Sequence, residues 1–367
     1  MTRRRGREPQ RPEIFFDQFR SALARLPAGL IRVMPPAAAE DLAGAEAALG
    51  RALPDIYAAF LRSFDGADLF HETVLIAGVG QAAPVRLAEL PQDRAGELTI
   101  ALGGAGDRYA LDGDGRVIRT DAGDDERALA GSTFARWLDA TVAREQVLYG
   151  PDGEYAPDVF DPSGEEVTPL VALRQAERAL KQDPGAAGAA HARGLALRRL
   201  GRAAAAVDAL DAAAALDPDN PWPWFDLGRA ALDDGQSGRA VTAFKAVADL
   251  QEGPEGARFL AWAARAAGDG AEADSLRAAA LARDSALGES LRRAVAAAAD
   301  DQDPEAEAEA AALLLAIAPG EVVAPRRRLP IFTEPAREPA APPPPPARPR
   351  RPRPAAPPRS GGPRRGS

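Results

Sequence analysis

Three short motifs have residue types and a spacing that could serve chemistry. The first, Asp112-Gly113-Asp114-Gly115, clusters carboxylate oxygens, which are the ligands that calcium prefers. It lacks a third acidic ligand, and Gly123 stands at the twelfth position, where a calcium loop carries its closing glutamate. Asp-Gly pairs between β-rich segments are typical of hairpin turns. A hairpin turn is therefore the favoured interpretation of this motif.

The second motif, Gly103-Gly104-Ala105-Gly106, is similar to glycine-rich loops that hold phosphate groups. Such loops lead into a helix N-terminus with a lysine, whereas a β-rich segment follows here, so we interpret the motif as a structural turn. The third candidate is His71, which lies near Asp65 and Asp68 in the sequence and could act as a base. A single histidine without a neighbouring nucleophile is more typical of a polar surface or turn residue.

Composition restricts the remaining catalytic chemistry. The chain has no cysteine, and its two histidines are His71 and His191. Thiolate nucleophiles, disulfides and cysteine-bound zinc are thereby excluded, and a histidine-built metal site is not expected. We predict no catalytic residue, no cofactor and no metal. A hydrolase that uses Asp112, Asp114 or His71 stays as a third hypothesis behind two binding functions.

Charge is segregated along the chain. The net charge is −9; residues 1–12 contribute +4 and residues 321–367 contribute +8, which leaves −21 for residues 13–320. An acidic body argues against nucleic-acid binding by the folded domains and favours a basic protein partner, because complementary fields speed association. The arginine-rich tail could bind nucleic acid weakly through phosphates or dock as a proline-rich ligand. A solvated low-complexity tail is the favoured interpretation.

No stretch of about 18 uncharged apolar residues is present, so we expect no membrane span. Residues 1–26 also lack the apolar core of a secretory signal. Together with the absence of cysteine, these features predict a cytoplasmic protein. Basic residues are almost all arginine, and alanine and proline are abundant, as in proteins of GC-rich bacteria.

Composition and periodicity divide the chain into six predicted segments. Residues 13–148 mix helical and strand periodicity, residues 167–319 are helical, and proline and arginine dominate the C-terminal end. The prediction is a basic disordered arm at 1–12, an α+β domain at 13–148, a linker at 149–166, helical repeats at 167–283, a C-terminal helical cap at 284–319 and a disordered tail at 320–367.

Within residues 13–148 we expect helices first, then an antiparallel sheet, then a closing helix. The predicted helices are 13–26, 37–49, 53–64 and 133–144, and the predicted strands are 73–77, 85–87, 98–102, 108–111 and 116–120.

The order and spacing of residues in this first domain resemble the SUKH superfamily of Smi/Knr-type domains. The resembling positions are Gly50, Leu53, Pro54, Tyr57, Phe60, Asp65, Gly66, Gly104, Gly106, Asp107, Tyr109 and Trp137. One departure is Asp65-Gly66-Ala67, where family members usually have Asn-Gly-Gly. The resemblance implies a non-enzymatic α+β binding domain. Many bacterial members are similar to immunity proteins that occlude a toxin, often a nuclease, and fungal relatives act as regulatory interaction hubs.

A 34-residue repeat marks the helical region, since helix pairs of this period stack into solenoids. The positions that recur are Gly194 and Gly228, Gly201 and Gly235, and Ala206 and Ala240. With Trp224, Leu227, Ala231 and Phe244 they resemble the tetratricopeptide family, which implies a concave face formed by the first helix of each pair. The residues expected on that face are His191, Leu195, Arg198, Trp222, Phe225, Arg229 and Leu232.

Two uses of that face stay open: a peptide-binding groove, or packing against a neighbouring helix or the N-terminal domain. The favoured function is a protein-binding adaptor, an immunity-type protein that occludes a toxin through its SUKH-like domain. The alternative is a regulatory scaffold that uses the repeats and the tail. The oligomeric state is not predicted.

Overall fold

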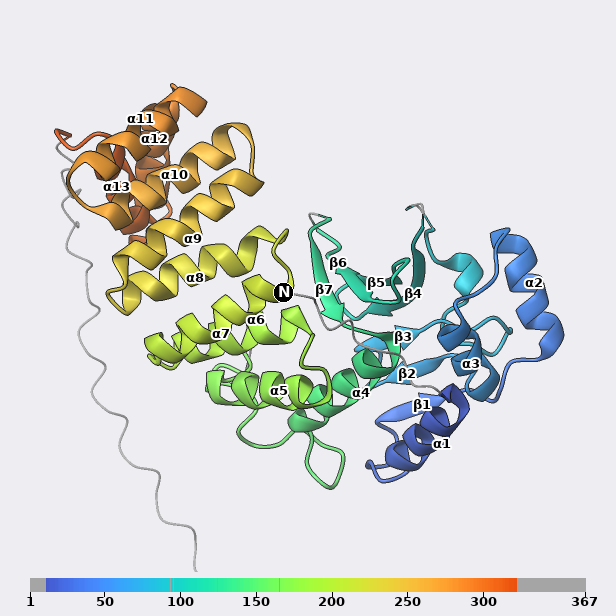
Figure 1. The fold of residues 1–367 in the computed structure, drawn as a ribbon. Coiled ribbons are helices and arrows are strands. Elements are labelled where there is room, and N and C mark those ends of the chain that lie inside the picture. Colours follow the sequence, from blue (N-terminus) through green and yellow to red (C-terminus); the bar gives the residue numbers. More distant parts are fainter. Residues whose placement is uncertain (1–10, 93, 95, 124, 165, 322–367) are drawn as a thin grey trace, which may run out of the picture. The chain divides into compact units, whose positions relative to one another are not determined.

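The computed structural model describes residues 11–321, except residues 93, 95, 124 and 165 (Figure 1). Most of the predicted basic arm and nearly all of the predicted tail lie outside the described residues. No helix in the described part of the chain combines the length and the apolar character needed to cross a membrane.

The N-terminal domain contains a seven-stranded antiparallel sheet, in which the strands follow one another in chain order (Figure 1). Its strands are β1 (Ile31–Val33), β2 (Ala67–Leu69), β3 (Val74–Ile76), β4 (Leu98–Gly103), β5 (Arg108–Leu111), β6 (Val117–Thr120) and β7 (Arg127–Gly131). The predicted α+β class of this domain is confirmed.

Four α-helices and two short 3₁₀ helices belong to the same domain. They are α1 (Pro12–Leu23), α2 (Ala39–Leu49), α3 (Asp55–Ser63), η1 (Leu87–Glu89), α4 (Phe134–Glu145) and η2 (Gln146–Leu148). Helix α3 begins after Pro54 and buries six of its nine residues. Its Phe60 contacts Phe16 of α1 and Phe134 of α4, with ring centroids 5.7 and 5.5 Å apart, so aromatic packing joins three helices over the sheet.

The strand predicted at residues 85–87 was wrong. Arg86 makes only a single parallel bridge to Gly78, and Leu87 begins the 3₁₀ helix η1 with its side chain buried. Leu87 is buried and its two neighbours are exposed, and this alternation is also typical of a strand. The segment was therefore predicted as a strand although it forms a 3₁₀ helix. Strands β1, β2 and β7 were not predicted, since two of them have three residues and β7 is rich in alanine and glycine.

The rest of the described chain is a run of helices in a solenoid-like arrangement, as predicted (Figure 1). The helices are α5 (Pro169–Gln182), α6 (Ala187–Arg199), α7 (Ala203–Leu216), α8 (Pro221–Asp233), α9 (Ser237–Leu250), α10 (Gly253–Ala267), α11 (Ala271–Arg283), α12 (Leu287–Asp300) and α13 (Pro304–Ile317). From α5 to α11 each helix packs on the next. Helix α13 packs on α12 and also returns to α10.

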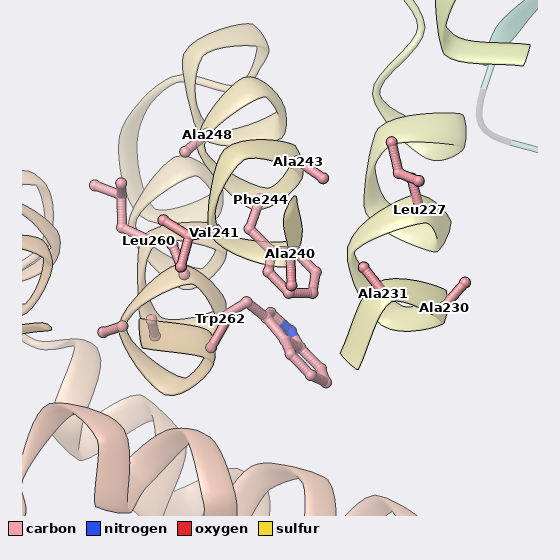
Figure 2. Close-up of a cluster of buried hydrophobic side chains, with 14 of the residues drawn as sticks. Leu227, Ala230, Ala231, Ala240, Val241, Ala243, Phe244, Ala248, Leu260 and Trp262 are labelled. Carbon is pink, nitrogen blue, oxygen red and sulfur yellow. The ribbon is translucent and has the colours of Figure 1, made fainter. Parts of the chain in front are cut away.

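The repeated glycines allow close helix packing. A Cβ atom on Gly194 would lie 2.4 Å from the Leu210 side chain, and one on Gly228 would lie 2.5 Å from the Phe244 ring. Figure 2 shows Phe244 of α9 in the apolar cluster with Leu227 and Ala231 of α8, and its ring centroid is 5.3 Å from that of Trp262. Any larger residue at these glycines would therefore push the two helices apart.

Helix α4 packs against both parts of the chain. Its Phe134, Trp137 and Leu138 side chains lie in the core of the N-terminal domain, and the helix also packs on α5. Next to it, the fully buried carboxylate of Asp183 accepts hydrogen bonds from the Ser132 N–H (2.7 Å) and the Ser132 hydroxyl (2.6 Å). Asp217 accepts a hydrogen bond from the Leu129 N–H at 2.9 Å. Leu129 lies in the edge strand β7, so the repeats occupy backbone groups that an open edge would leave unpaired.

Candidate functional site

The Asp65-Gly66 turn, where the sequence departs from the SUKH pattern, is fixed by the chain itself. The buried Asp65 carboxylate accepts hydrogen bonds from the Val79 N–H (2.6 Å) and the Gly80 N–H (2.9 Å). Gly66 has φ +90°, and a Cβ there would lie 2.8 Å from the carbonyl oxygen of Ile76. Asp65 therefore holds the loop at residues 78–80. The asparagine that is usual in the family has only one side-chain oxygen, so it offers fewer acceptor sites for the same bonds.

The next motif residues position helices α2 and α3. Gly50 ends α2 in the left-handed conformation, with φ 65°, and the Leu53 N–H donates to the Glu46 carboxylate at 3.0 Å. Tyr57 is completely buried, and its hydroxyl donates to the carbonyl oxygen of Ala77 at 2.7 Å. Burial, and secondarily the charge of Asp65, raise the pKa of Tyr57 far above its ordinary value, so it stays a neutral donor.

The glycine-rich motif forms the turn between β4 and β5. The Gly103 N–H donates to the carbonyl oxygen of Asp107 at 2.7 Å, Gly106 has φ +89°, and a Cβ on Gly104 would lie 3.3 Å from the carbonyl oxygen of Glu72. Since its backbone donor is used within the turn and a strand follows, this segment has the geometry of a hairpin turn and not of a phosphate loop.

Asp107 and Tyr109 belong to a polar cluster under α4. The Asp107 carboxylate lies 3.1 Å from Nε of Arg119, and the Tyr109 ring centroid lies 5.2 Å from that of Trp137. Burial raises the pKa of Tyr109, and the nearby guanidinium groups of Arg144 and Arg119 oppose that rise. Nε of Arg119 is buried and makes no hydrogen bond within the described residues, so Asp107 and Arg119 interact as a charge pair, while the Tyr109–Trp137 ring contact joins the sheet to the helix.

The candidates for chemistry are engaged in turns. Asp112 accepts hydrogen bonds from the N–H groups of Asp114 and Arg116, both at 2.9 Å, as the hairpin interpretation predicts. The described residues contain no group of three or more acidic, histidine or cysteine side chains that could hold a metal. His71 lies in the β2–β3 turn with φ 55°, where Asp68 accepts a hydrogen bond from the Glu72 N–H at 2.8 Å.

In the repeats, two of the predicted concave residues pair with acids on the next helix of the same type. Nε2 of His191 lies 2.7 Å from the Asp226 carboxylate, and Nε of Arg198 donates to Asp233 at 2.7 Å. Both pairs join α6 to α8 across 35 positions, close to the repeat period. The sequence signal that could have identified these acids is this offset, because residues one repeat apart lie on neighbouring helices.

The aromatic residues of the concave set divide between surface and core. Trp222 remains 36% exposed, whereas Phe225 packs against Phe244, Phe259 and Trp262 with ring centroids 6.0, 5.5 and 5.7 Å away. Leu195 is partly buried, and Leu232 is partly buried against the apolar core.

Arg229 lies near helix α13, which the sequence analysis did not predict as its neighbour. Its guanidinium lies 3.8 Å from the Glu309 carboxylate of α13 and 5.7 Å from the centroid of the Phe225 ring. Arg229 and Arg258 line a hollow of about 340 Å³ with residues of α12 and α13. The C-terminal helices therefore share the face on which these arginines lie.

Comparison with known proteins agrees with this architecture. Residues 36–140 match the SMI1 / KNR4 family (SUKH-1), and residues 197–263 match a tetratricopeptide repeat. The chain combines a SUKH-1 domain with tetratricopeptide repeats. Both kinds of domain bind proteins, so the chain has the architecture of a protein-interaction adaptor.

Two solved structures are similar to part of the chain. One is YrrB, described as a TPR protein with an unusual peptide-binding site; it is 20% identical, with 42% of this chain and 79% of that chain covered and a TM-score of 0.29. The other is a double mutant of MamA, RS-1 ArsTM, 19% identical, with 41% of this chain and 85% of that chain covered and a TM-score of 0.28. None of the curated proteins compared with the chain matches it.

Proposed function

We propose that this chain is a non-enzymatic cytoplasmic adaptor whose SUKH-1 domain binds and occludes a toxin protein, as an immunity protein does, while the repeats make a second protein contact. The observation that carries the proposal is the charge of −21 over residues 13–320, on an architecture of two protein-binding domains. Toxins that act on nucleic acid present basic surfaces, and an acidic partner speeds encounter with such a surface and covers it.

The use of polar side chains supports binding over hydrolysis. Asp112 and Asp65 bind backbone N–H groups of their own loops, and Asp107 lies against Arg119. A general acid or base must reach a substrate proton, and these carboxylates are already occupied by the fold. The hydrolase hypothesis for Asp112, Asp114 or His71 therefore stands behind the binding hypotheses.

Helix α2 is the place where the charge argument can be tested without disturbing the core. None of its residues is buried, and Glu40 and Asp41 are exposed in its first turn. We expect a toxic domain to be encoded beside the gene of this chain, and we expect the full chain to form a complex with that domain and to protect cells that produce it. Glu40→Lys with Asp41→Lys should slow association about tenfold at low salt, with little change at high salt, because steering is screened.

The matched control is Glu252→Lys with Glu255→Lys, which reverses the same number of exposed charges at the start of α10. This pair should leave the rate of toxin binding nearly unchanged, as it lies on the repeats. A full-length chain that neither protects the cells nor binds the toxic domain would refute the proposed function.

The exposed Trp222 favours the scaffold alternative, since exposed aromatic residues are common at protein interfaces. Under that alternative Trp222→Ala should abolish binding of a client protein. Under immunity, the same variant should protect cells as well as the unaltered chain. Any contribution of the proline- and arginine-rich tail lies outside the described residues.

A further inference from the structure

A cavity of about 730 Å³ lies between the N-terminal domain and the first helix of the repeats. Residues from the loop between α1 and β1, from α4, from η2 and the turn after it, and from α5 form its walls. The lining residues are Arg25, Leu26, Pro27, Leu30, Ala143, Gln146, Val147, Tyr149, Gly150, Pro151, Arg178 and Gln182. This volume is within the range of about 300–1,000 Å³ found for ligand sites.

The lining of this cavity is positively charged although the surrounding body is acidic. It contains two guanidinium groups, Arg25 and Arg178, and no carboxylate. Neither guanidinium has a carboxylate within 4.0 Å in the described part of the chain, whereas Arg174 of the same helix as Arg178 and Arg199 of the next helix are both paired. Two unpaired arginines in a concave site without acids favour an anionic ligand.

The positively charged lining extends from the cavity into a neighbouring hollow. Arg178 and Val147 also line a neighbouring hollow of about 440 Å³, together with Arg174, Lys181 and Glu177. The two hollows are adjacent because they share residues of α5 and η2. Apolar side chains also line the two hollows: Leu26 and Val147 are partly buried, and Leu30 is only 2% exposed. An elongated ligand that carries both acidic and apolar groups fits this lining.

The aromatic residue of the cavity does not provide a free ring face. Tyr149 is stacked between Phe70 and Tyr155, with ring centroids 5.5 and 4.9 Å away. A nucleotide base would need such a face for stacking, so the chemistry points away from nucleotides. Gln146 and Gln182 add side-chain amides, which suit the backbone groups of a peptide.

We propose that this cavity binds an acidic, extended peptide segment of a partner protein, with its carboxylates on Arg25 and Arg178 and its apolar side chains against Leu26 and Val147. The two ends of this chain are excluded as occupants by charge, since residues 1–12 carry +4 and residues 321–367 carry +8. The site is separate from the acidic surface proposed for a toxin, and it stands whether or not the chain confers immunity.

The test uses the full chain and a fluorescein-labelled pentapeptide of sequence Glu-Leu-Glu-Leu-Glu, followed by fluorescence anisotropy. The acidic peptide should bind with an affinity that falls as salt rises, and the corresponding Lys-Leu-Lys-Leu-Lys peptide should bind the cavity at least tenfold more weakly. Arg178→Ala and Arg25→Ala should each weaken the acidic peptide about tenfold, because each removes a charge-assisted hydrogen bond.

Arg193→Ala is the matched control, since Arg193 is exposed on α6 and lines neither hollow. This variant should bind the acidic peptide as the unaltered chain does. The double variant Arg25→Glu/Arg178→Glu should reverse the preference toward the lysine peptide, and both positions are exposed, so the fold should persist by circular dichroism. Undiminished binding of the acidic peptide by the double variant, or equal binding of both peptides by the unaltered chain, would overturn the proposal. Inorganic phosphate at millimolar concentration should not displace the peptide; complete displacement would show a simple anion site instead.

Discussion

At the scale of single residues, some acidic side chains of this protein act as hydrogen-bond acceptors within its own fold. Asp65, Asp112 and Asp183 each accept at least two hydrogen bonds, and two of the three are buried. A buried carboxylate that is fully bonded stabilises the folded state, whereas one that is desolvated without compensation does not. Asp139 of α4 is of the second kind.

Burial raises the pKa of Asp139 from its usual range to about 6. The folded-state pKa lies above the unfolded value of about 3.9. Ionising Asp139 therefore costs more free energy in the folded state than in the unfolded state. The destabilisation is absent below about pH 4, increases between about pH 4 and pH 6, and is complete at higher pH. Asp139→Asn removes it, so the variant should be more stable at pH 7.5 by about 1 kcal/mol, after discounting for partial exposure.

Urea unfolding of both proteins at pH 7.5 and pH 4.5 measures this difference. The gain from Asp139→Asn should be clear at pH 7.5 and small at pH 4.5. A variant that loses stability at pH 7.5 would show instead that the Asp139 carboxylate has a favourable charged partner in the folded protein.

At the scale of elements, the repeat glycines set how closely paired helices approach. Gly228→Ala would place a methyl group 2.5 Å from the Phe244 ring, which is itself fully buried and close to Trp262. The ring cannot move without disturbing its neighbours, so we expect a loss of about 1–3 kcal/mol in the free energy of unfolding. Thermal unfolding followed by circular dichroism gives this value.

Gly238→Ala is the matched control for that substitution. Gly238 is exposed in the first turn of α9, and a Cβ there would meet no atom within 4 Å. Alanine should therefore stabilise the protein by up to about 1 kcal/mol through helix propensity. If both substitutions had the same effect, close packing would not be the reason for the glycine in the repeat.

The sequence predicted the elements whose apolar residues follow a regular period. The helices at α3 and α4 and the hairpin of β5 and β6 agree with the structure within two residues at each end, because Phe60, Trp137 and the Asp112 turn carry strong local signals. The three-residue strands β1 and β2 could not be predicted, since their pairing depends on distant residues, such as Ile31 opposite Leu69. Tertiary contacts decide such short strands.

Only part of the candidate surfaces could be predicted from the sequence. The 34-residue period placed His191 and Arg198 on one helix face, but it did not reveal that Glu309 of α13 lies near Arg229. The cavity lined by the α1–β1 loop, α4, η2 and α5 was also not predicted. Arg25 and Arg178 are 153 positions apart, and no local pattern connects them.

At the scale of the whole molecule, the SUKH-1 domain and the repeats share a hydrogen-bonded contact. Asp183 binds Ser132 at the start of α4, and Asp217 binds the N–H of Leu129 in β7. These bonds satisfy backbone donors at a sheet edge, where unpaired groups would otherwise favour association with other chains. The repeats therefore cover this edge of the SUKH-1 sheet and bind its free backbone donors.

Asp183→Ala tests that coupling. The carboxylate is fully buried and accepts from the Ser132 N–H, the Ser132 hydroxyl and the Gly185 N–H, so its loss leaves three donors without their acceptor. We expect a loss of about 3 kcal/mol in unfolding free energy. Hydrogen exchange of peptides from β7 should become faster, while peptides from α9 and α10 should change little. Asp208→Ala, an exposed position on α7, is the control and should alter neither. Equal acceleration of exchange throughout the chain would mean that Asp183 supports global stability alone, whereas selective acceleration at β7 requires that the repeats protect the edge of the sheet.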